Sequence, residues 1–532
     1  MAHASRLLVC SLLLVALSTT EAFAAGFTFP ENLTRAMGRG GAWIAGVDDA
    51  SALYLNPGAL TRIERGSLLL NVNIIDHDLR FQRNPREDRS NPLNPLSFEY
   101  DEVRNESRPY IAPMLFGGMR VGDLPLVLAT GIYGPSSVGR LRFPDPPIRD
   151  DRSGDESLDG GQRYMIIEQD VILFYPSIAA AWRFDDINLS LGITGQLAVT
   201  MIDYNIAIDG SHSNPTVRAN GSVTVRDQLE SETYLTRTRL DVSGAVPTLI
   251  LGALWEPHPR FALGASWRPR FTVRSSGTID VEFPPDLRGL SDDGSIAILN
   301  DDVRLEINFP HVVRLGALYR HLGAEDREHF NVELAGVYEG WSVLEEYVVR
   351  TDVQVQLPNL AAHGDQDPFF VRELPDLRLP KQYRDSVSIR LGGEFHPLHH
   401  NPETPRLSLR AGGFLETAAT RPEYAHLDFL SPRRIGTSVG ASWNVLHRSG
   451  AVSSIDVGFS MIFSPDIVLQ EGEGRYDLLV PLWICGSPQT DAEREYCDTV
   501  APEDAPGVGQ PVNEGRYQSH MNIFSVGLSH RW

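Results

Sequence analysis

The last residues of the chain, Asn522-Ile-Phe-Ser-Val-Gly-Leu-Ser-His-Arg-Trp532, show the pattern that decides the fold. Apolar residues recur at Phe524, Val526, Leu528 and Trp532, with small or polar residues between them. Because a strand turns successive side chains to opposite faces, this stretch predicts a strand with one apolar and one small, polar face. A terminal strand remains an unpaired sheet edge unless it joins the first strand and closes a barrel. We therefore expect the rest of the chain to repeat this element around a closed barrel.

The chain has 532 residues, a net charge of −22 and a sequence pI near 5.1. This acidic balance argues against nucleic acid as a partner, because phosphate contacts need a basic surface. Mean hydropathy is −0.18, far from the value expected of a helical membrane protein. A membrane β-barrel is compatible with that value, because only alternate residues of each strand meet lipid.

Residues 1–24 are expected to be a signal peptide. Arg6 precedes an apolar run from Leu7 to Leu17, which is too short to span a bilayer. Ala22-Phe23-Ala24 supplies the small residues of a cleavage site. The mature chain is therefore expected to begin at Ala25 in an exported protein.

Two cysteines of the mature chain, Cys485 and Cys497, lie in a stretch rich in proline and acidic residues. In an oxidising compartment such a pair most simply forms a disulfide that fixes a loop. Metal or redox chemistry is the alternative, but the pair lacks Cys-x-x-Cys spacing and a nearby histidine. His396, His399 and His400 are expected to form an exposed turn rather than a tetrahedral metal site. We expect neither a metal site nor a cofactor.

Residues 25–65 differ from the rest of the chain. They are rich in Gly and Ala, include Gly38-Arg39-Gly40-Gly41, and turn at Asn56-Pro57-Gly58. No lysine follows the glycines at the spacing of a phosphate-binding loop, so a nucleotide site is not expected. Asp48-Asp49-Ala50-Ser51-Ala52-Leu53 is expected to open a short helix with an aspartate cap. These residues predict a compact plug.

From residue 66 to residue 532, strand-like stretches recur, and their connections alternate between short and long. Short turns such as Gly122-Asp123 and Asp185-Asp186 alternate with long polar segments, the longest from Pro465 to Gln518. An even number of strands, with short turns at one end and long loops at the other, is how outer-membrane barrels are built. We predict an all-β fold, a transmembrane antiparallel β-barrel of about 14 strands with residues 25–65 as a plug in its lumen.

Other strands repeat the two faces of the last one. Between Ile435 and Val445 apolar residues alternate with glycine, serine and asparagine, which suit a crowded lumen better than a soluble surface. Aromatic residues near the short turns are expected to form an interfacial girdle, with ordinary core aromatics as the alternative. The girdle candidates are Trp182, Trp255, Trp267, Tyr319, Phe395, Trp443 and Trp532.

The chain resembles the FadL-type outer-membrane long-chain fatty-acid transporters, a family that includes aromatic-hydrocarbon channels. Ala25-Gly26-Phe27 resembles the mature start of that family, and Thr34 to Ala42 and Asp48 to Gly58 resemble its N-terminal block. Family members usually have Asn-Pro-Ala where this chain has Asn56-Pro57-Gly58. A weaker similarity is Gly131-Ile132-Tyr133-Gly134-Pro135 in the third strand. The resemblance covers essentially the whole mature chain.

This resemblance implies an outer-membrane barrel whose N-terminal hatch closes the periplasmic end. It implies passive transport of hydrophobic molecules, either long-chain fatty acids or related hydrocarbons, with sideways exit through a kink in the third strand. Sideways exit is physically reasonable, because each buried CH₂ group gains roughly 0.8 kcal/mol and release into water is unfavourable. Gly131, Gly134 and Pro135 can bend a strand there, although a plain strand end before a loop is the alternative. The residues expected to form or gate the hatch are Ala25, Gly26, Phe27, Asn56, Pro57 and Gly58.

A fatty-acid carboxylate needs a cation or hydrogen-bond donors in an apolar pocket. Several arginines face the lumen by strand parity, and so do Glu333 and Glu394, so ion-pair networks are the alternative use of these cations. The candidate head-group contacts are Arg268, Arg314, Arg390 and Arg410.

Two other functions compete with transport. An adhesin or structural barrel would act through the long loops, whereas an outer-membrane lipid hydrolase or protease would need a nucleophile, a base and an acid. No Gly-x-Ser-x-Gly or His-Glu-x-x-His pattern is present, so we do not expect an enzyme. We expect a monomer in the outer membrane, in contact with lipopolysaccharide. The acidic runs Asp150-Asp151 and Asp292-Asp293 either hold divalent ions beside lipopolysaccharide or form solvated loops.

Overall fold

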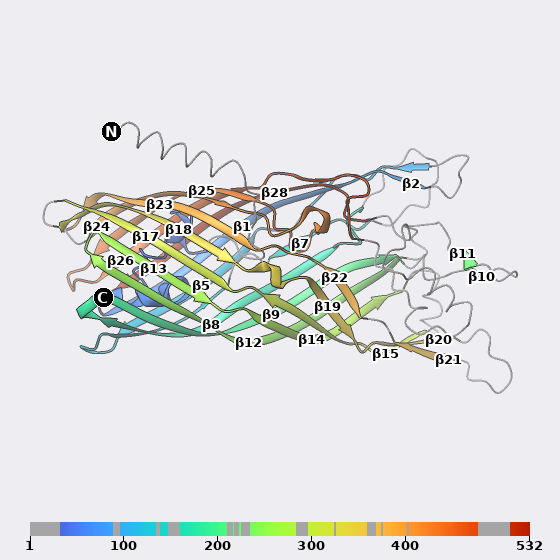
Figure 1. The fold of residues 1–532 in the computed structure, drawn as a ribbon, viewed down its shortest axis with the longest axis horizontal. Coiled ribbons are helices and arrows are strands. Elements are labelled where there is room, and N and C mark those ends of the chain that lie inside the picture. Colours follow the sequence, from blue (N-terminus) through green and yellow to red (C-terminus); the bar gives the residue numbers. More distant parts are fainter. Residues whose placement is uncertain are drawn as a thin grey trace, which may run out of the picture.

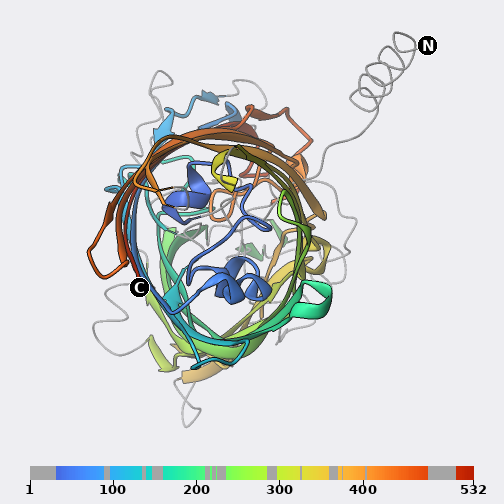
Figure 2. The same cartoon turned by 90° about the vertical axis from the view of Figure 1, so that its left-hand side faces the viewer.

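A computed structural model of the chain describes residues 32–88, 96–134, 139–146, 160–209, 216–217, 223–224, 235–283, 296–323, 326–358, 369–373, 376–401, 404–476 and 511–532. These residues form an elongated closed barrel with a short N-terminal segment inside it (Figures 1 and 2). Several predictions lie outside the described residues: the signal peptide, Ala25, Gly26, Phe27, Pro135, both acidic runs, Cys485 and Cys497.

The described residues form fourteen wall strands, as the sequence predicts, and seven of them consist of two segments. The first seven wall strands are β1 (Gly66–Arg83), β4 with β5 (Val103–Arg104, Tyr110–Arg120), β6 with β7 (Leu126–Tyr133, Arg140–Arg142), β8 (Glu168–Phe184), β9 (Leu189–Asp209), β12 (Leu235–His258) and β13 with β14 (Phe261–Arg268, Phe271–Glu282). The other seven are β16 with β17 (Asp302–Phe309, Val312–Leu322), β18 with β19 (Glu328–Glu339, Glu346–Thr351), β22 with β23 (Leu377–Pro380, Ser386–His399), β24 (Pro405–Glu416), β25 (Arg434–Leu446), β26 with β27 (Val452–Phe463, Ile467–Leu469) and β28 (Gly515–Arg531).

The first and last strands close the barrel. β1 and β28 pair antiparallel along their whole length, from Ser67 opposite Arg531 to Arg83 opposite Gly515. Every other wall strand pairs with its neighbours in the chain, so the sheet has no free edge along the wall. This closure confirms the expectation drawn from the terminal strand, since an unpaired edge there would invite association with other chains.

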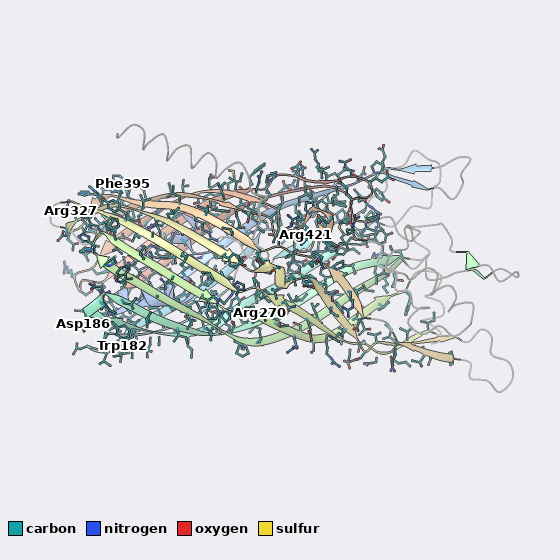
Figure 3. The ribbon with its side chains drawn as sticks, viewed as in Figure 1. Trp182, Asp186, Arg270, Arg327, Phe395 and Arg421 are labelled. Carbon is teal, nitrogen blue, oxygen red and sulfur yellow. The ribbon has the colours of Figure 1, made fainter. Side chains whose placement is uncertain are left out.

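The two faces of the strands are those that the sequence predicts. Phe524 and Leu528 are 44% and 48% exposed on the outer surface, whereas Ser525 is 0% exposed in the lumen. An outer surface of exposed apolar residues around a polar interior is the reverse of a soluble protein, and it fits a wall surrounded by lipid. Of the predicted girdle, Trp182 and Phe395 lie near the short-turn end in Figure 3, and both are exposed. Trp267 differs, because it lies at the end of β13 away from the short turn that joins β13 to β12.

Four strands between β13 and β23 are interrupted where the outer surface changes from apolar to charged. Pro269-Arg270 separates β13 from β14, and Pro310-His311 separates β16 from β17. Each proline lacks the N–H group needed to continue the ladder. The alternating pattern alone predicts one strand over residues 260–282 and one over residues 303–320, but each range forms two strands. The segments beyond the breaks extend the wall on the long-loop side, toward the right in Figure 1.

The remaining described elements are short. Three helical turns form the hatch: α2 (Thr34–Met37), α3 (Ala52–Leu55) and η1 (Pro57–Arg62). Others lie in turns and loops: η2 (Asp185–Ile187), η6 (Trp341–Val343), η7 (Pro422–Tyr424), β2 (Arg86–Asp88), β3 (Leu96–Phe98), β10 (Thr216–Val217), β11 (Val223–Thr224), β15 (Ala297–Asn300), β20 (Gln354–Pro358) and β21 (Phe369–Glu373). None of the helices among the described residues is both long and apolar enough to cross a membrane.

Candidate functional site: a lumen divided by the hatch

The hatch fits closely against a ring of wall glycines. Added Cβ atoms on these glycines would lie 2.0 to 2.9 Å from the hatch backbone, which is too close for any side chain. Glycine therefore allows the hatch backbone to touch the wall directly, as the small-residue lumen face predicts. The glycines that meet the hatch backbone in this way are Gly192, Gly252, Gly264, Gly392 and Gly412.

Glu333 of β18 holds one stretch of the hatch. Its carboxylate accepts hydrogen bonds from the backbone N–H groups of Ile44, Ala45 and Gly46 at 2.6, 2.8 and 2.8 Å. Its side chain is completely buried. Three donors on one carboxylate form a strong, charge-assisted attachment between the hatch and the wall.

The turn predicted to gate the hatch is built around Asn56. The Nδ2 group of Asn56 donates to the carbonyl oxygens of Ile44 and Ala253, both at 3.0 Å, and its Oδ1 caps η1 by accepting from the N–H of Gly58. A Cβ atom on Gly58 would lie 2.9 Å from the backbone of Ala253. This contact explains why glycine stands here in place of the alanine usual in the family. Pro57 begins η1 and packs beside Gly192 of the wall.

The predicted aspartate cap is wrong in its detail. Helix α3 begins at Ala52, and Ser51 precedes it without a side-chain cap. Asp49 instead accepts from the N–H of Ser51 at 2.9 Å, and burial raises the pKa of Asp49. Burial also opposes ionisation of Asp48, but Arg35 and Arg531 outweigh it and lower the pKa of Asp48. Two adjacent carboxyl groups thus have opposite pKa shifts.

The third wall strand is described as two segments, β6 and β7, and we call the junction between them the strand break; residues 135–138 of this junction lie outside the described residues. Pairing with β8 ends at Tyr133 opposite Tyr175 and resumes at Arg140 opposite Asp170. Gly131 lies within β6, and Gly134 follows the last residue of that strand. The carbonyl of Gly134 accepts a hydrogen bond of 2.8 Å from Nδ2 of Asn32, so the first described residue of the hatch is attached to the break.

An aromatic cluster lies between the hatch and this break. The ring of Tyr133 is 4.6 Å from that of Tyr54 in the hatch, 5.8 Å from Phe116 and 5.4 Å from Tyr175. All four rings are buried. The guanidinium of Arg314 lies 5.1 Å from the centre of the Tyr54 ring. This cluster joins the hatch, the strand break and one of the predicted arginines.

The four predicted arginines all lie in the lumen and are all buried, but they do not form one site. Arg268 lies over Phe271 at 5.5 Å, in the same part of the barrel as Arg314. Arg390 contacts Ser388 and lies 4.0 Å from Glu416. Arg410, in the middle of β24, pairs with Glu394 at 2.7 Å. The predicted ion-pair alternative therefore describes Arg390 and Arg410.

On the long-loop side of the hatch, the lumen contains an apolar cavity of about 60 Å³. Inward-facing residues of the wall extensions form most of its lining, and Phe429 and Asp428 close one side. Its other lining residues are Ile202, Tyr204, Ile206, Thr238, Leu240, Ile279, Leu305, Ile307, Tyr347, Val349, Leu377 and Leu379. We call this space the apolar cavity.

A buried ion pair supports the edge of the apolar cavity. Nζ of Lys381 donates to both carboxylate oxygens of Asp428 at 2.7 Å, and both side chains are 1% exposed. Nδ1 of His426 lies 2.6 Å from Asp428 Oδ1. Burial lowers the pKa of His426 to about 4. Burial opposes ionisation of Asp428, but His426 and Lys381 lower its pKa, so Asp428 is a carboxylate whose charge is already matched.

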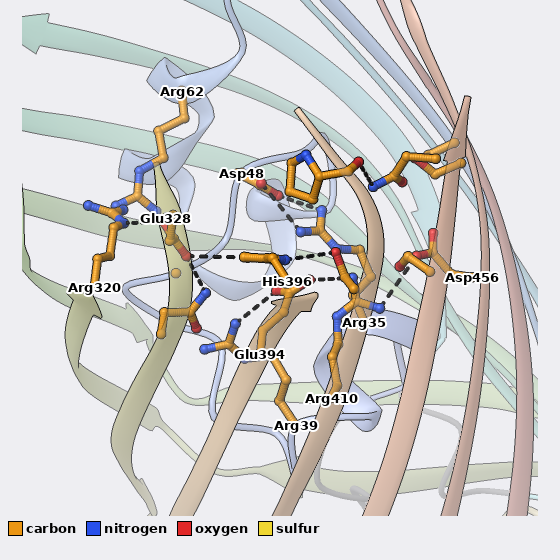
Figure 4. A pocket seen from close by; sticks show the side chains of 18 of the residues that line it. Arg35, Arg39, Asp48, Arg62, Arg320, Glu328, Glu394, His396, Arg410 and Asp456 are labelled. Carbon is orange, nitrogen blue, oxygen red and sulfur yellow. Dashed lines mark hydrogen bonds and ion pairs between the residues drawn. The ribbon is translucent and has the colours of Figure 1, made fainter. Parts of the chain in front are cut away.

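On the short-turn side of the hatch lies a second, polar space of about 190 Å³, which we call the vestibule (Figure 4). Figure 4 shows Arg39 and Arg410 approaching Glu394 from two sides. Six arginines, four carboxylates and one histidine line it, and these are Arg35, Arg39, Arg62, Arg320, Arg410, Arg531, Asp48, Glu328, Glu394, Asp456 and His396.

The histidine-rich turn is only partly as predicted. His396 is buried rather than exposed, and its Nδ1 lies 3.0 Å from the hydroxyl of Ser408. Its Nε2 lies 3.5 Å from Glu328. His396 has even parity within β23, which turns it to the lumen, and this signal was available in the sequence. Within the ranges that the structure describes, no group of three or more His, Cys, Asp or Glu residues could hold a metal ion.

The fold and the site together define a plugged β-barrel with an apolar outer surface. The family model described as outer membrane protein transport protein (OMPP1/FadL/TodX) matches residues 162–482. The chain belongs to this family, whose members are transport proteins of the outer membrane. The assignment confirms the resemblance, the location and the transport function expected from the sequence. No curated protein sequence matches the chain.

Solved structures share the fold. A FadL homologue of Pseudomonas aeruginosa has 16% identity and a TM-score of 0.65, and the match covers 95% of this chain and 100% of that one. The toluene transporter TodX of P. putida has 13% identity and a TM-score of 0.55, covering 96% and 98%. The toluene transporter TbuX of Ralstonia pickettii has 13% identity and a TM-score of 0.52, covering 94% and 99%.

Proposed function

We propose that this protein carries small, neutral hydrophobic molecules passively across the outer membrane. The apolar cavity is the observation that supports this proposal most strongly. It lies on the extracellular side of the hatch, since long loops of outer-membrane barrels face outward. An apolar ligand that enters it leaves water and gains roughly 0.8 kcal/mol for each CH₂ group buried.

The charges beside the apolar cavity favour neutral cargo. Asp428 is the charged residue of its lining, and Lys381 already occupies both of its oxygens. A fatty-acid carboxylate would add a second negative charge next to this matched pair, at the cost of its own hydration. The similarity in fold to two toluene transporters agrees with neutral hydrocarbons as cargo.

The route from the cavity would lead along the aromatic cluster to the strand break. We propose that Gly131, Gly134 and Pro135 form the opening toward lipid. We also propose that the hatch turn moves to let cargo pass, and this turn consists of Asn56, Pro57 and Gly58. Arg268 and Arg314 lie near the aromatic cluster and are the arginines best placed to contact a polar head group. Arg390 and Arg410 are held by carboxylates, so we assign them no cargo contact.

The boundaries of the chain's parts belong to the same proposal. Residues 1–24 would be a signal peptide, and residues 25–65 the hatch, with Ala25, Gly26 and Phe27 at its start. Residues 66–532 would be the barrel with its long extracellular loops. The disulfide between Cys485 and Cys497 remains a prediction from sequence.

Contact with lipopolysaccharide is supported by a belt of ion pairs on the outer surface of the wall extensions. In each pair the arginine is more exposed than its acid; for example, Arg274 is 74% exposed and Glu306 is 34% exposed. The belt thus presents guanidinium groups, which bind phosphate well. The other pairs are Arg104–Asp78, Arg140–Asp170, Arg142–Glu168, Arg239–Asp203, Arg378–Glu346 and Arg516–Asp466. A closed wall covered by lipid is also consistent with a monomer.

Uptake of labelled toluene and labelled oleate by cells that lack their own transporter tests the proposal. Ile307→Asn places an amide in the apolar cavity, and Val303→Asn places one on the same face of β16 outside the cavity lining. We expect wild-type protein and Val303→Asn to carry toluene in clear preference to oleate, and Ile307→Asn to reduce toluene uptake about tenfold. Uptake of oleate but not toluene would contradict the neutral cargo. Equal uptake by both variants would contradict the role of the cavity.

A further inference from the structure

We propose that the vestibule is a binding site for a small carboxylate anion from the periplasm. This inference goes beyond the transport of neutral molecules and does not depend on it. The central residues of the site are Arg39 of the hatch and Arg410 of β24, with Glu394 between them.

The vestibule lies on the short-turn side of the hatch, which faces the periplasm, and is separate from the apolar cavity. Its wall residues lie near the short turns: Arg320 is two residues from the end of β17, and Arg531 ends β28. The hatch lies between the two spaces, held by Glu333 and by the ring of wall glycines. A ligand of the vestibule therefore arrives from the side that hydrophobic cargo does not use.

Glu394 shows how the two arginines hold a carboxylate. Its Oε2 lies 3.2 Å from Nη1 of Arg39, and its Oε1 lies 2.7 Å from Nη2 of Arg410. The pair comes from two parts of the chain that are far apart in sequence, so the arrangement exists only when the hatch is seated. Arginine is suited to this task, because its planar fork of donors matches a carboxylate.

Both arginines retain donors after binding Glu394. Nη2 of Arg39 and Nε and Nη1 of Arg410 have no hydrogen-bond partner within the described part of the chain, although Nη1 of Arg410 lies 3.5 Å from Asp456. The two side chains are only 1% and 2% exposed. A buried polar group without a partner is unfavourable, so these N–H groups require an acceptor from the solvent side.

A small carboxylate fits this requirement better than water alone. Its two oxygens accept several N–H groups at once and carry the charge that arginine prefers. Leu318 and Pro405 also line the vestibule and can contact a small apolar body. Glu394 and Asp456 oppose a second anion, so we expect modest affinity. Asp456 Oδ2 also lacks a partner and is suited to a bound water or ligand hydroxyl.

Calorimetric titration of the full-length protein in detergent tests the site with three probes of similar size: benzoate, benzamide and benzylammonium. Benzamide is disfavoured in the apolar cavity, because burying its amide without hydrogen-bond partners is unfavourable. We expect saturable binding of benzoate in the millimolar range, with at least tenfold weaker binding of the other two. Equal binding of all three would overturn the proposal, because the vestibule would then select by size or apolar contact. Absence of saturable benzoate binding would overturn it as well, leaving a hydrated space only.

Variants locate the binding. Arg39→Gln and Arg410→Gln should each weaken benzoate binding at least tenfold, whereas Arg390→Gln removes a lumen arginine outside the vestibule and should change it less than twofold. Heat-modified gel mobility checks that each barrel is folded. If a vestibule variant does not fold, the three-probe titration of the wild type still decides. Toluene uptake is measured separately, so failure of hydrocarbon transport and failure of the anion site are distinguishable.

Discussion

The apolar cavity and the vestibule are two spaces in one lumen, and their linings have opposite chemistry. The cavity is lined by aliphatic and aromatic side chains, and its ion pair is internally matched. The vestibule is lined by arginines and carboxylates. A hatch of a few dozen residues separates them. We infer from this difference that the hatch divides the barrel into an extracellular space for apolar molecules and a periplasmic space for polar ones.

The wall produces this difference because the alternation of inward-facing and outward-facing residues shifts by one residue where a strand is interrupted. In β13 the exposed residues are odd, as in Leu263 and Trp267, whereas in β14 the buried residues are odd, as in Phe271 and Val273. The break at Pro269-Arg270 lies between them. Apolar side chains therefore face lipid on the short-turn side of the break and face the lumen on its long-loop side.

The largest expected effect concerns the ion pair beside the apolar cavity. Lys381→Met leaves the Asp428 carboxylate buried without its cation, and this should lower the free energy of unfolding by about 3–5 kcal/mol. The double variant Lys381→Met/Asp428→Leu should recover most of the loss. Urea titration followed by tryptophan fluorescence measures both. A double variant as unstable as Lys381→Met would show that the pair does more than match charge.

The next effect concerns the seal between the two spaces. Glu333→Gln replaces a carboxylate that accepts hydrogen bonds from three hatch N–H groups with a neutral amide. This should weaken the attachment of the hatch to the wall by about 3 kcal/mol. We expect the hatch to loosen and single-channel ion conductance to appear in planar bilayers. Glu328→Gln, near the turn, is the matched control and should remain closed. Closed channels in both variants would show that Glu333 is not needed for the seal.

A pH effect is expected from the cavity side. His426 has a pKa of about 4 in the folded protein, below its ordinary value of 6.5, because it is buried. The unfolded chain therefore binds a proton first as the pH falls, and stability should drop by about 2–3 kcal/mol between pH 6.5 and pH 4. His426→Gln should remove this part of the pH dependence of unfolding. If the free energy of unfolding of His426→Gln depends on pH as in the wild type, groups other than His426 cause the pH dependence.

The smallest effect concerns the attachment of the hatch to the strand break. Asn32→Ala removes one hydrogen bond to Gly134 and should weaken this attachment by about 1 kcal/mol. We expect faster hydrogen exchange at the amides on either side of the break, and no change at the Glu333 attachment. Exchange that is unchanged at the break would contradict a coupling between hatch and opening.

The sequence predicts the fold well, because the period-two pattern, the alternation of loop lengths and the final strand all depend on local chemistry. It also places the four arginines in the lumen. It misses the apolar cavity, because the pattern alone predicts one continuous strand through Pro269 and another through Pro310. A continuous strand keeps the same alternation of faces throughout, so it wrongly places Val273 and Ile307 on the outer surface. It misses the vestibule, because Arg39 and Glu394 are far apart in the chain and only the seated hatch brings them together.

The central claim is that hydrophobic molecules bind on the extracellular side of the hatch and not on its periplasmic side. Crystals of the protein soaked with bromobenzene test this most directly through the anomalous signal of bromine. The account predicts bromine in the apolar cavity beside Ile307 and Leu240, and none in the vestibule. Bromine beside Arg39 and Arg410, with an empty apolar cavity, would contradict it.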